Sequence, residues 1–188
     1  MHDDPTPRLV FPDTTVLINF ALVDEMPLLG QLVANNGSWC GTVASECDDQ
    51  ASKQGLPHMR DAHDIFGEPL RLETPAEFVN FRLNQDFFRQ ASTNPDATHA
   101  GESETLAILT SRSIKSVVVS DDEGVPLRLA NLDVSPTIQA TTSWHFFVWP
   151  TGRDTSLRRA SGRSAVSCWA RSGVAPTRFV IVRDSLNG

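Results

Sequence analysis

An α/β domain with a mostly parallel central sheet is the fold class that the sequence predicts, because strand and helix signals alternate along its 188 residues. Residues 8–11 predict a short buried strand, and after Asp13 the apolar residues take up helical spacing, beginning with Val16 and Leu17. The segment 116–120, Ser-Val-Val-Val-Ser, is a β-branched run bounded by polar residues, which is typical of a buried parallel strand. A strand that leads into a helix is the opening of an α/β unit.

The next elements are predicted from apolar spacing and from residues that begin or end helices. Residues 28–33 form a second helical face, and residues 35–37, Asn-Asn-Gly, suit a left-handed stop at its C-terminus. Residues 38–41 predict a short strand, and Thr42 is a suitable N-cap for the helix that follows. Residues 58–66 predict another helix.

The second half of the chain carries one specific helix signal. Thr74 precedes Pro75, and Glu77 stands three residues after Thr74, which is the pattern of a capping box with proline at the first helical position. The other elements predicted here are a short strand at 70–72, a loop at 92–101, a helix from Gly101, and helices at 127–132 and 137–147.

Charge divides the chain into two parts. Residues 1–150 hold nine Lys and Arg against 21 Asp and Glu, whereas residues 151–188 hold seven Arg against two Asp. We therefore predict one domain over 1–150 and a separate basic C-terminal segment over 151–188, either solvated or facing phosphate. The net charge of −7 does not suggest nucleic-acid binding through bulk electrostatics.

Several classes of protein are disfavoured by composition. The N-terminus MHDDPTPRLV is acidic and rich in proline, and no run approaches 18 apolar residues, so we expect a soluble cytoplasmic protein with no membrane segment. The three cysteines lack the spacing of a disulfide framework or a zinc site, which favours ordinary reduced thiols.

Acidic residues follow both of the best-defined strands. Asp13 comes after the first strand and the pair Asp121-Asp122 after the later one, where the ligand sites of parallel sheets lie. Glu46 and Glu102 fall near helix starts, on faces turned towards the core. Such a cluster repels itself unless a cation compensates, and carboxylate oxygens suit Mg²⁺ or Mn²⁺. Histidine is absent from these stretches, which argues against zinc.

Other polar residues are interpreted as structural. We expect Glu104 to be a capping or solvent-facing acid, since it lies on another side of its helix from Glu102. His99 and His145 are each interpreted as solvated or packed histidines.

Four stretches together resemble one known family. Residues 11–18, 43–46, 101–107 and 118–122 resemble, in that order, the PIN-domain ribonucleases, including the VapC-type toxins of bacterial toxin–antitoxin pairs. The resemblance extends over roughly residues 8–135 and departs from the family's pattern after that.

The resemblance implies a PIN-like three-layer α/β/α sandwich with an acidic pocket that binds Mg²⁺ or Mn²⁺ and cuts RNA. Asp13, Glu46 and Glu102 would be catalytic and metal-binding, and either Asp121 or Asp122 would be the fourth acid. Thr14 and Ser120 would orient the carboxylates. An antitoxin protein and a homodimer are the partners that it implies.

Three other functions fit the same acids. A metal-dependent DNA nuclease of the flap-endonuclease kind has a similar pattern, although 188 residues leave little room for its clamping elements. A catalytically silent PIN-like module would bind RNA or protein, and the acids at all four positions count against it. An aspartate-based phosphotransfer domain would need a lysine after the later strand, and no lysine follows Lys115.

Overall fold

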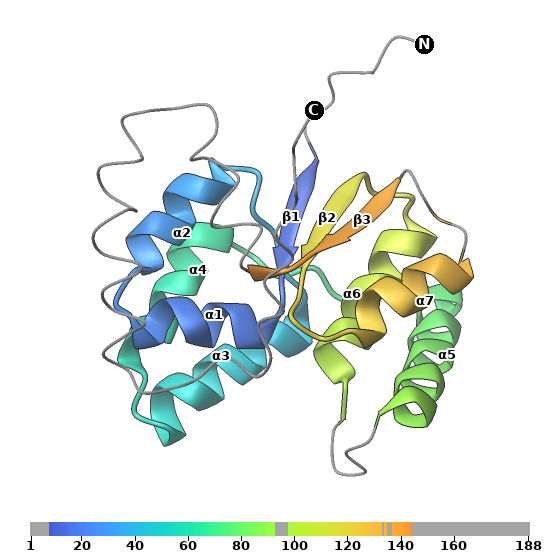
Figure 1. Ribbon diagram of the computed structural model, residues 1–188, viewed down its shortest axis with the longest axis horizontal. Helices are drawn as coiled ribbons and strands as arrows, with labels where there is room; N and C mark the ends of the chain where they lie inside the picture. Colours follow the sequence, from blue (N-terminus) through green and yellow to red (C-terminus); the bar gives the residue numbers. More distant parts are fainter. Residues whose placement is uncertain (1–7, 93–97, 133, 135–136, 144–188) are drawn as a thin grey trace, which may run out of the picture.

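Three parallel strands form the centre of the protein (Figure 1). The computed structural model describes residues 8–92, 98–132, 134 and 137–143. Strands β1 (Leu9–Pro12), β2 (Ser116–Val119) and β3 (Ile138–Thr141) lie in the order β1-β2-β3, and both pairs are parallel. The predicted α/β class with a parallel sheet is confirmed.

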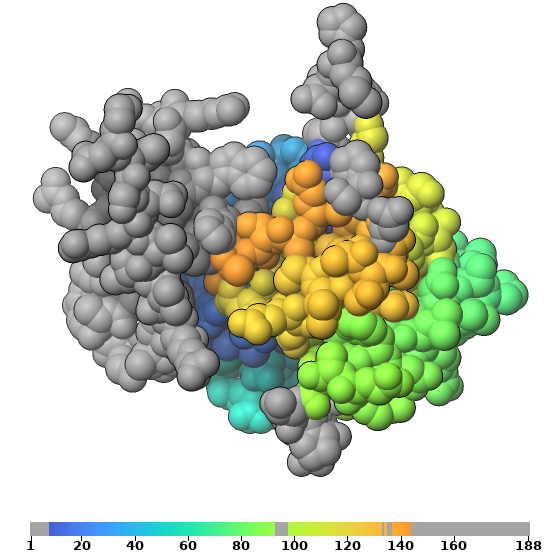
Figure 2. Space-filling model, turned by 45° about the vertical axis from the view of Figure 1, so that its right-hand side comes forward, coloured from blue at the N-terminus to red at the C-terminus, as the bar shows by residue number. Residues whose placement is uncertain are grey.

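Helices flank the sheet on two sides, an arrangement compatible with a three-layer α/β/α fold (Figure 1). One side holds α1 (Thr14–Leu22), α2 (Met26–Val33), α3 (Gly41–Lys53), the 3-10 helix η1 (Pro57–Arg60) and α4 (Asp61–Phe66). The other side holds α5 (Pro75–Ala91), α6 (Ala100–Ser111) and α7 (Gly124–Leu132). Figure 2 shows α7 lying against α5 on one face of the molecule.

Side-chain alternation along the strands produces two cores. Phe11 and Val118 face a cluster that α5, α6 and α7 complete with residues such as Phe88. Val10 and Val119 face the other cluster, which is built mainly by α1 to α4. Neighbouring residues of a strand point to opposite faces, so a strand buried on both faces is apolar throughout, as predicted for residues 116–120.

The strands predicted at 38–41 and 70–72 are reduced to single bridges. Gly37 pairs in parallel with Val10, and Cys40 pairs in parallel with Leu70, so this segment continues the sheet beyond β1. A Cβ at Gly37 would lie 2.7 Å from the Phe66 ring, which requires glycine there.

Local helix signals are partly confirmed. The capping box at Thr74 and Glu77 is present at the start of α5. The left-handed stop after α2 falls on Ala34 (φ 46°) and Asn35 (φ 66°). The N-cap predicted at Thr42 is wrong, because α3 begins at Gly41 after Cys40.

The helix predicted over 137–147 is wrong where the structure describes it. Residues Ile138–Thr141 form β3, with Ile138 only 2% exposed in the cluster around Val118. This segment forms a strand because it pairs in parallel with the edge of β2. Such tertiary pairing overrides a weak local helical spacing. Residues 144–147, His145 and the segment 151–188 lie outside the described residues.

No helix among the described residues has the length and apolarity needed to cross a bilayer.

A buried ion pair ties the start of α5 to the end of α6. Glu77 is 1% exposed and accepts a hydrogen bond of 2.6 Å from Arg112 Nε. Its second oxygen accepts from the backbone N–H groups of Glu73 and Thr74. The bond from Arg112, with those N–H groups, lowers the pKa of Glu77 to about 2.

We expect Glu77→Gln to lower the free energy of unfolding by about 2 to 4 kcal/mol at pH 7, because it removes the buried carboxylate that pairs with Arg112 and leaves it only the exposed Glu73, 3.5 Å away. The pKa of Glu77 is depressed, so its contribution is complete above about pH 4.5 and is lost as the pH falls towards about 2. Urea denaturation across this range measures the effect. Asp86→Asn, which removes the exposed pair with Arg89, serves as the control and should cost less than about 1 kcal/mol. Equal losses in both variants would contradict the prediction.

Candidate functional site

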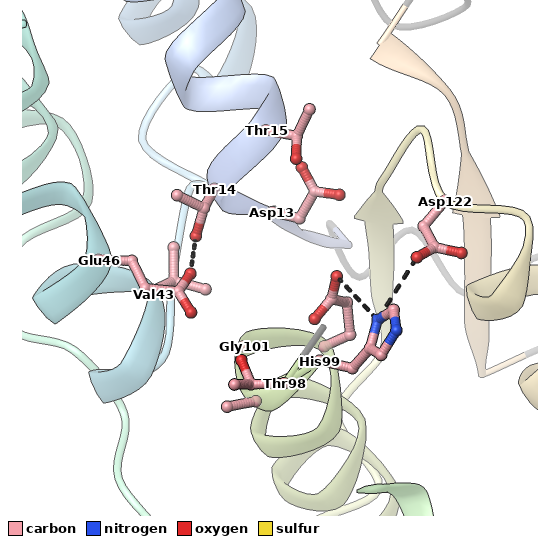
Figure 3. Close-up of a pocket in the computed structure, with 11 residues that line it drawn as sticks. Asp13, Thr14, Thr15, Val43, Glu46, Thr98, His99, Gly101 and Asp122 are labelled. Atoms are coloured by element: carbon pink, nitrogen blue, oxygen red, sulfur yellow. Dashed lines mark hydrogen bonds and ion pairs between the residues drawn. The ribbon is translucent and has the colours of Figure 1, made fainter. Parts of the chain in front are cut away.

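A polar pocket opens where β1 and β2 end, at the carboxyl edge of the sheet (Figure 3). Its volume is about 220 Å³. The lining residues come from the start of α1, from α3, from the start of α6 and from the turn after β2: Asp13, Thr14, Thr15, Val43, Glu46, Thr98, His99, Ala100, Gly101, Glu102 and Asp122. Four of these residues are acids that the sequence predicted for a site.

Asp13 is the most buried of these acids, at 8% exposed. It is the N-cap of α1, and its Oδ1 accepts a hydrogen bond of 2.8 Å from the backbone N–H of Val16. Its Oδ2 accepts a bond of 2.5 Å from the hydroxyl of Ser120, which follows β2. Burial raises the pKa of Asp13 to about 7, although both hydrogen bonds oppose the rise.

Glu46 enters the pocket from α3, and the hydroxyl of Thr14 donates to its Oε2 (Figure 3). Burial raises the pKa of Glu46 above its ordinary value. Gly101 lets the start of α6 approach this point, because a Cβ there would lie 3.1 Å from Val43 Cγ2 and 3.5 Å from Glu46 Oε2. Ser120 and Thr14 each donate a hydrogen bond to a pocket carboxylate, Asp13 and Glu46 respectively. This is the arrangement that the family resemblance implied for the two hydroxyls.

Glu102 and Asp122 complete the acidic set. Glu102 lies in the first turn of α6, and its pKa is raised by burial first and then by the negative charges of Asp122 and Glu46. The Oδ1 of Asp122 accepts a bond of 2.7 Å from the N–H of Gly124, and its own N–H donates to the hydroxyl of Ser120. Ser120 thus contacts both Asp13 and Asp122.

Asp121 and Glu104 serve other contacts. The carboxylate of Asp121 accepts from the N–H and the hydroxyl of Ser143, at 2.9 and 2.6 Å, and it is absent from the pocket lining. Of the two aspartates left open by the sequence, Asp122 is the one that the fold places in the pocket. Glu104, expected as a cap or a solvent-facing acid, is 7% exposed and caps α3 by accepting a bond of 2.6 Å from the N–H of Thr42.

His99 is a pocket residue that sequence reasoning missed. Its ring stacks on Phe88 with centroids 5.5 Å apart, so the expectation of a packed histidine holds in part. The same ring lines the pocket, with Nδ1 at 3.6 Å from Asp122 Oδ2 and 4.0 Å from Glu102 Oε1 (Figure 3). A signal was present in the sequence, since His99 stands three residues before Glu102, and in the structure it is the residue that directly precedes α6.

Comparisons of the chain with protein-family models, with curated proteins and with solved structures give no match.

Asp13→Asn should stabilise the metal-free protein at pH 8. The folded pKa of Asp13 is about 7 against an ordinary 3.8, so the free energy of unfolding of the wild type falls as the pH rises between these values. The amide keeps an acceptor for Val16 and a donor for Ser120 without a buried charge. We expect a gain of roughly 2 to 4 kcal/mol at pH 8 and little difference near pH 4.

Chemical denaturation in EDTA at both pH values measures this difference. Asp49→Asn, an exposed acid on α3 paired with Lys53, should leave stability nearly unchanged. An Asp13→Asn protein that is less stable than the wild type at pH 8 would show that the carboxylate stabilises the fold.

Proposed function

We propose that the protein is a metal-dependent endoribonuclease of the PIN type and the toxin of a toxin–antitoxin pair. The observation that carries this proposal is the convergence of Asp13, Glu46, Glu102 and Asp122 on one pocket at the carboxyl edge of the sheet. These acids are up to 109 positions apart in the chain, and each comes from a different element or turn.

The donor set fits a hard divalent ion. The pocket offers carboxylate oxygens and hydroxyls, which are the ligands that Mg²⁺ and Mn²⁺ prefer. The pKa values of Asp13, Glu46 and Glu102 are all raised in the metal-free protein, in each case by burial first. A cation that binds there compensates these like charges and displaces the protons that the carboxyl groups hold in its absence.

The residues of the chain divide the work of phosphodiester hydrolysis. Asp13, Glu102 and Asp122 would hold the ion, which supplies activation of water and stabilises charge on the leaving oxygen. Asp13 is fixed by Ser120 and Val16 before any ligand arrives. Glu46 lies across the pocket from Asp122 (Figure 3), and its raised pKa suits a carboxylate that accepts a proton from the attacking water.

RNA as the substrate and an antitoxin as the partner come from the resemblance of the four acidic stretches to the family. A DNA nuclease and a catalytically silent module remain the alternatives, and the same pocket would serve either. A homodimer is proposed on the same basis.

Cleavage of mixed RNA substrates with Mg²⁺, Mn²⁺ or EDTA tests the proposal. We expect EDTA to abolish cutting, and Asp13→Asn, Glu46→Gln or Asp122→Asn to lower the rate by about 100-fold or more. Asp49→Asn is the matched control on α3, and Asp121→Asn should stay within about threefold of the wild type if Asp122 is the fourth acid.

Each alternative predicts a different outcome. Metal-dependent cutting of DNA but not RNA would replace the proposal with the DNA nuclease. Binding of RNA without cleavage in any metal would replace it with the silent module, and activity indifferent to both EDTA and Asp13→Asn would exclude this pocket as the site.

A further inference from the structure

The imidazole of His99 faces two carboxylates at distances that a hydrogen bond does not explain. Nδ1 lies 3.6 Å from Asp122 Oδ2 and 4.0 Å from Glu102 Oε1, beyond ordinary hydrogen-bond range. One ligand atom from each of these three residues lies within 4.8 Å of the other two. Atoms that share one ion at about 2.1 Å lie roughly 3 to 4 Å from one another, and the two distances from Nδ1 fall in this range.

The other contacts of the His99 ring among the described residues include no hydrogen bond that would explain its orientation. Nε2 is buried and has no hydrogen-bond partner among the described residues. One face of the ring stacks on Phe88 at an interplanar angle of 23°. The side chain is 12% exposed, so the ring is held in place by packing while Nδ1 points at the acids.

We propose that His99, Glu102 and Asp122 form a mixed nitrogen and oxygen site for a first-row transition-metal ion, with Mn²⁺ bound in preference to Mg²⁺. This inference rests on the proposed function only in taking the pocket as a metal site. The family resemblance implied carboxylate ligands alone, and the imidazole is a further donor. Imidazole nitrogen suits zinc, copper, iron and nickel best. Mn²⁺ prefers oxygen ligands but accepts an imidazole more readily than Mg²⁺, which keeps oxygen ligands and water. The sequence argued against zinc because histidine is absent from the acidic stretches. That argument no longer holds, since His99 lies beside two of the acids.

Electron spin-echo spectroscopy of Mn²⁺ bound to the full-length protein tests the site without any substrate. The wild type should show the nitrogen coupling of a directly bound imidazole, and His99→Asn should lose it. Asparagine is chosen because it tolerates the left-handed backbone of His99, whose φ is 46°. His58→Asn is the matched control, since His58 lies 3.4 and 3.5 Å from Asp24 and Asp61 but is half exposed.

Calorimetric titration gives the second readout. We expect His99→Asn to weaken Mn²⁺ binding by about tenfold or more and Mg²⁺ binding by less than about threefold, while His58→Asn changes neither. His99→Gly, which adopts the left-handed backbone without strain, repeats the comparison should the asparagine variant fold poorly.

The outcomes separate this inference from the proposed function. Bound Mn²⁺ without nitrogen coupling in the wild type, or equal losses of Mn²⁺ and Mg²⁺ affinity in His99→Asn, would overturn the mixed site even if the protein cuts RNA. Nitrogen coupling that depends on His99, in a protein that cuts no RNA, would support the site and refute the ribonuclease.

Discussion

The hydrogen bond from Ser120 to Asp13 is the contact on which the pocket depends. It joins the residue after β1 to the residue after β2, so the two parallel strands end in one polar unit. The same hydroxyl accepts from the N–H of Asp122 and thereby sets the turn that carries the second acid. Asp13 also caps α1, so one buried carboxylate fixes the direction of a helix and one wall of the pocket. Moving this side chain away from Ser120 and Val16 would disturb both the start of α1 and the wall of the pocket.

Burial of this carboxylate is unfavourable in the metal-free protein, and the surrounding structure offsets the cost. The raised pKa values of Asp13, Glu46 and Glu102 are the measure of that cost. Away from the pocket, Glu77 and Arg112 form a pair whose effect has the opposite sign, since the pKa of Glu77 is lowered. Unfavourable buried groups that cluster at one site, in a fold stabilised by well-paired groups elsewhere, are typical of functional sites.

The sequence predicted what depends on local pattern and missed what depends on distant packing. The strand at 116–120 and the capping box at Thr74 are written in neighbouring residues, and both are present. The strand at Ile138–Thr141 exists because β2 offers a free edge, a fact that no local window contains. The choice between Asp121 and Asp122 was open for the same reason, because it is decided by Ser143, 22 residues away. His99 was missed because its place in the pocket depends on the turn after β2, which brings Asp122 beside the start of α6.

The charge balance of the pocket constrains how any phosphate-containing substrate could approach it. Among the described residues that line the pocket none is Lys or Arg, so these side chains present carboxylates to a negatively charged phosphate backbone. The N-termini of α1 and α6 are the electropositive groups in the described lining, and both are weak beside four acids. A bound cation would therefore have to attract the phosphate as well as take part in its hydrolysis. If the proposed ion and the proposed RNA substrate bind here, the occupancy of the pocket by the ion and the affinity for the substrate should be coupled, and the identity of the ion would affect binding as well as chemistry.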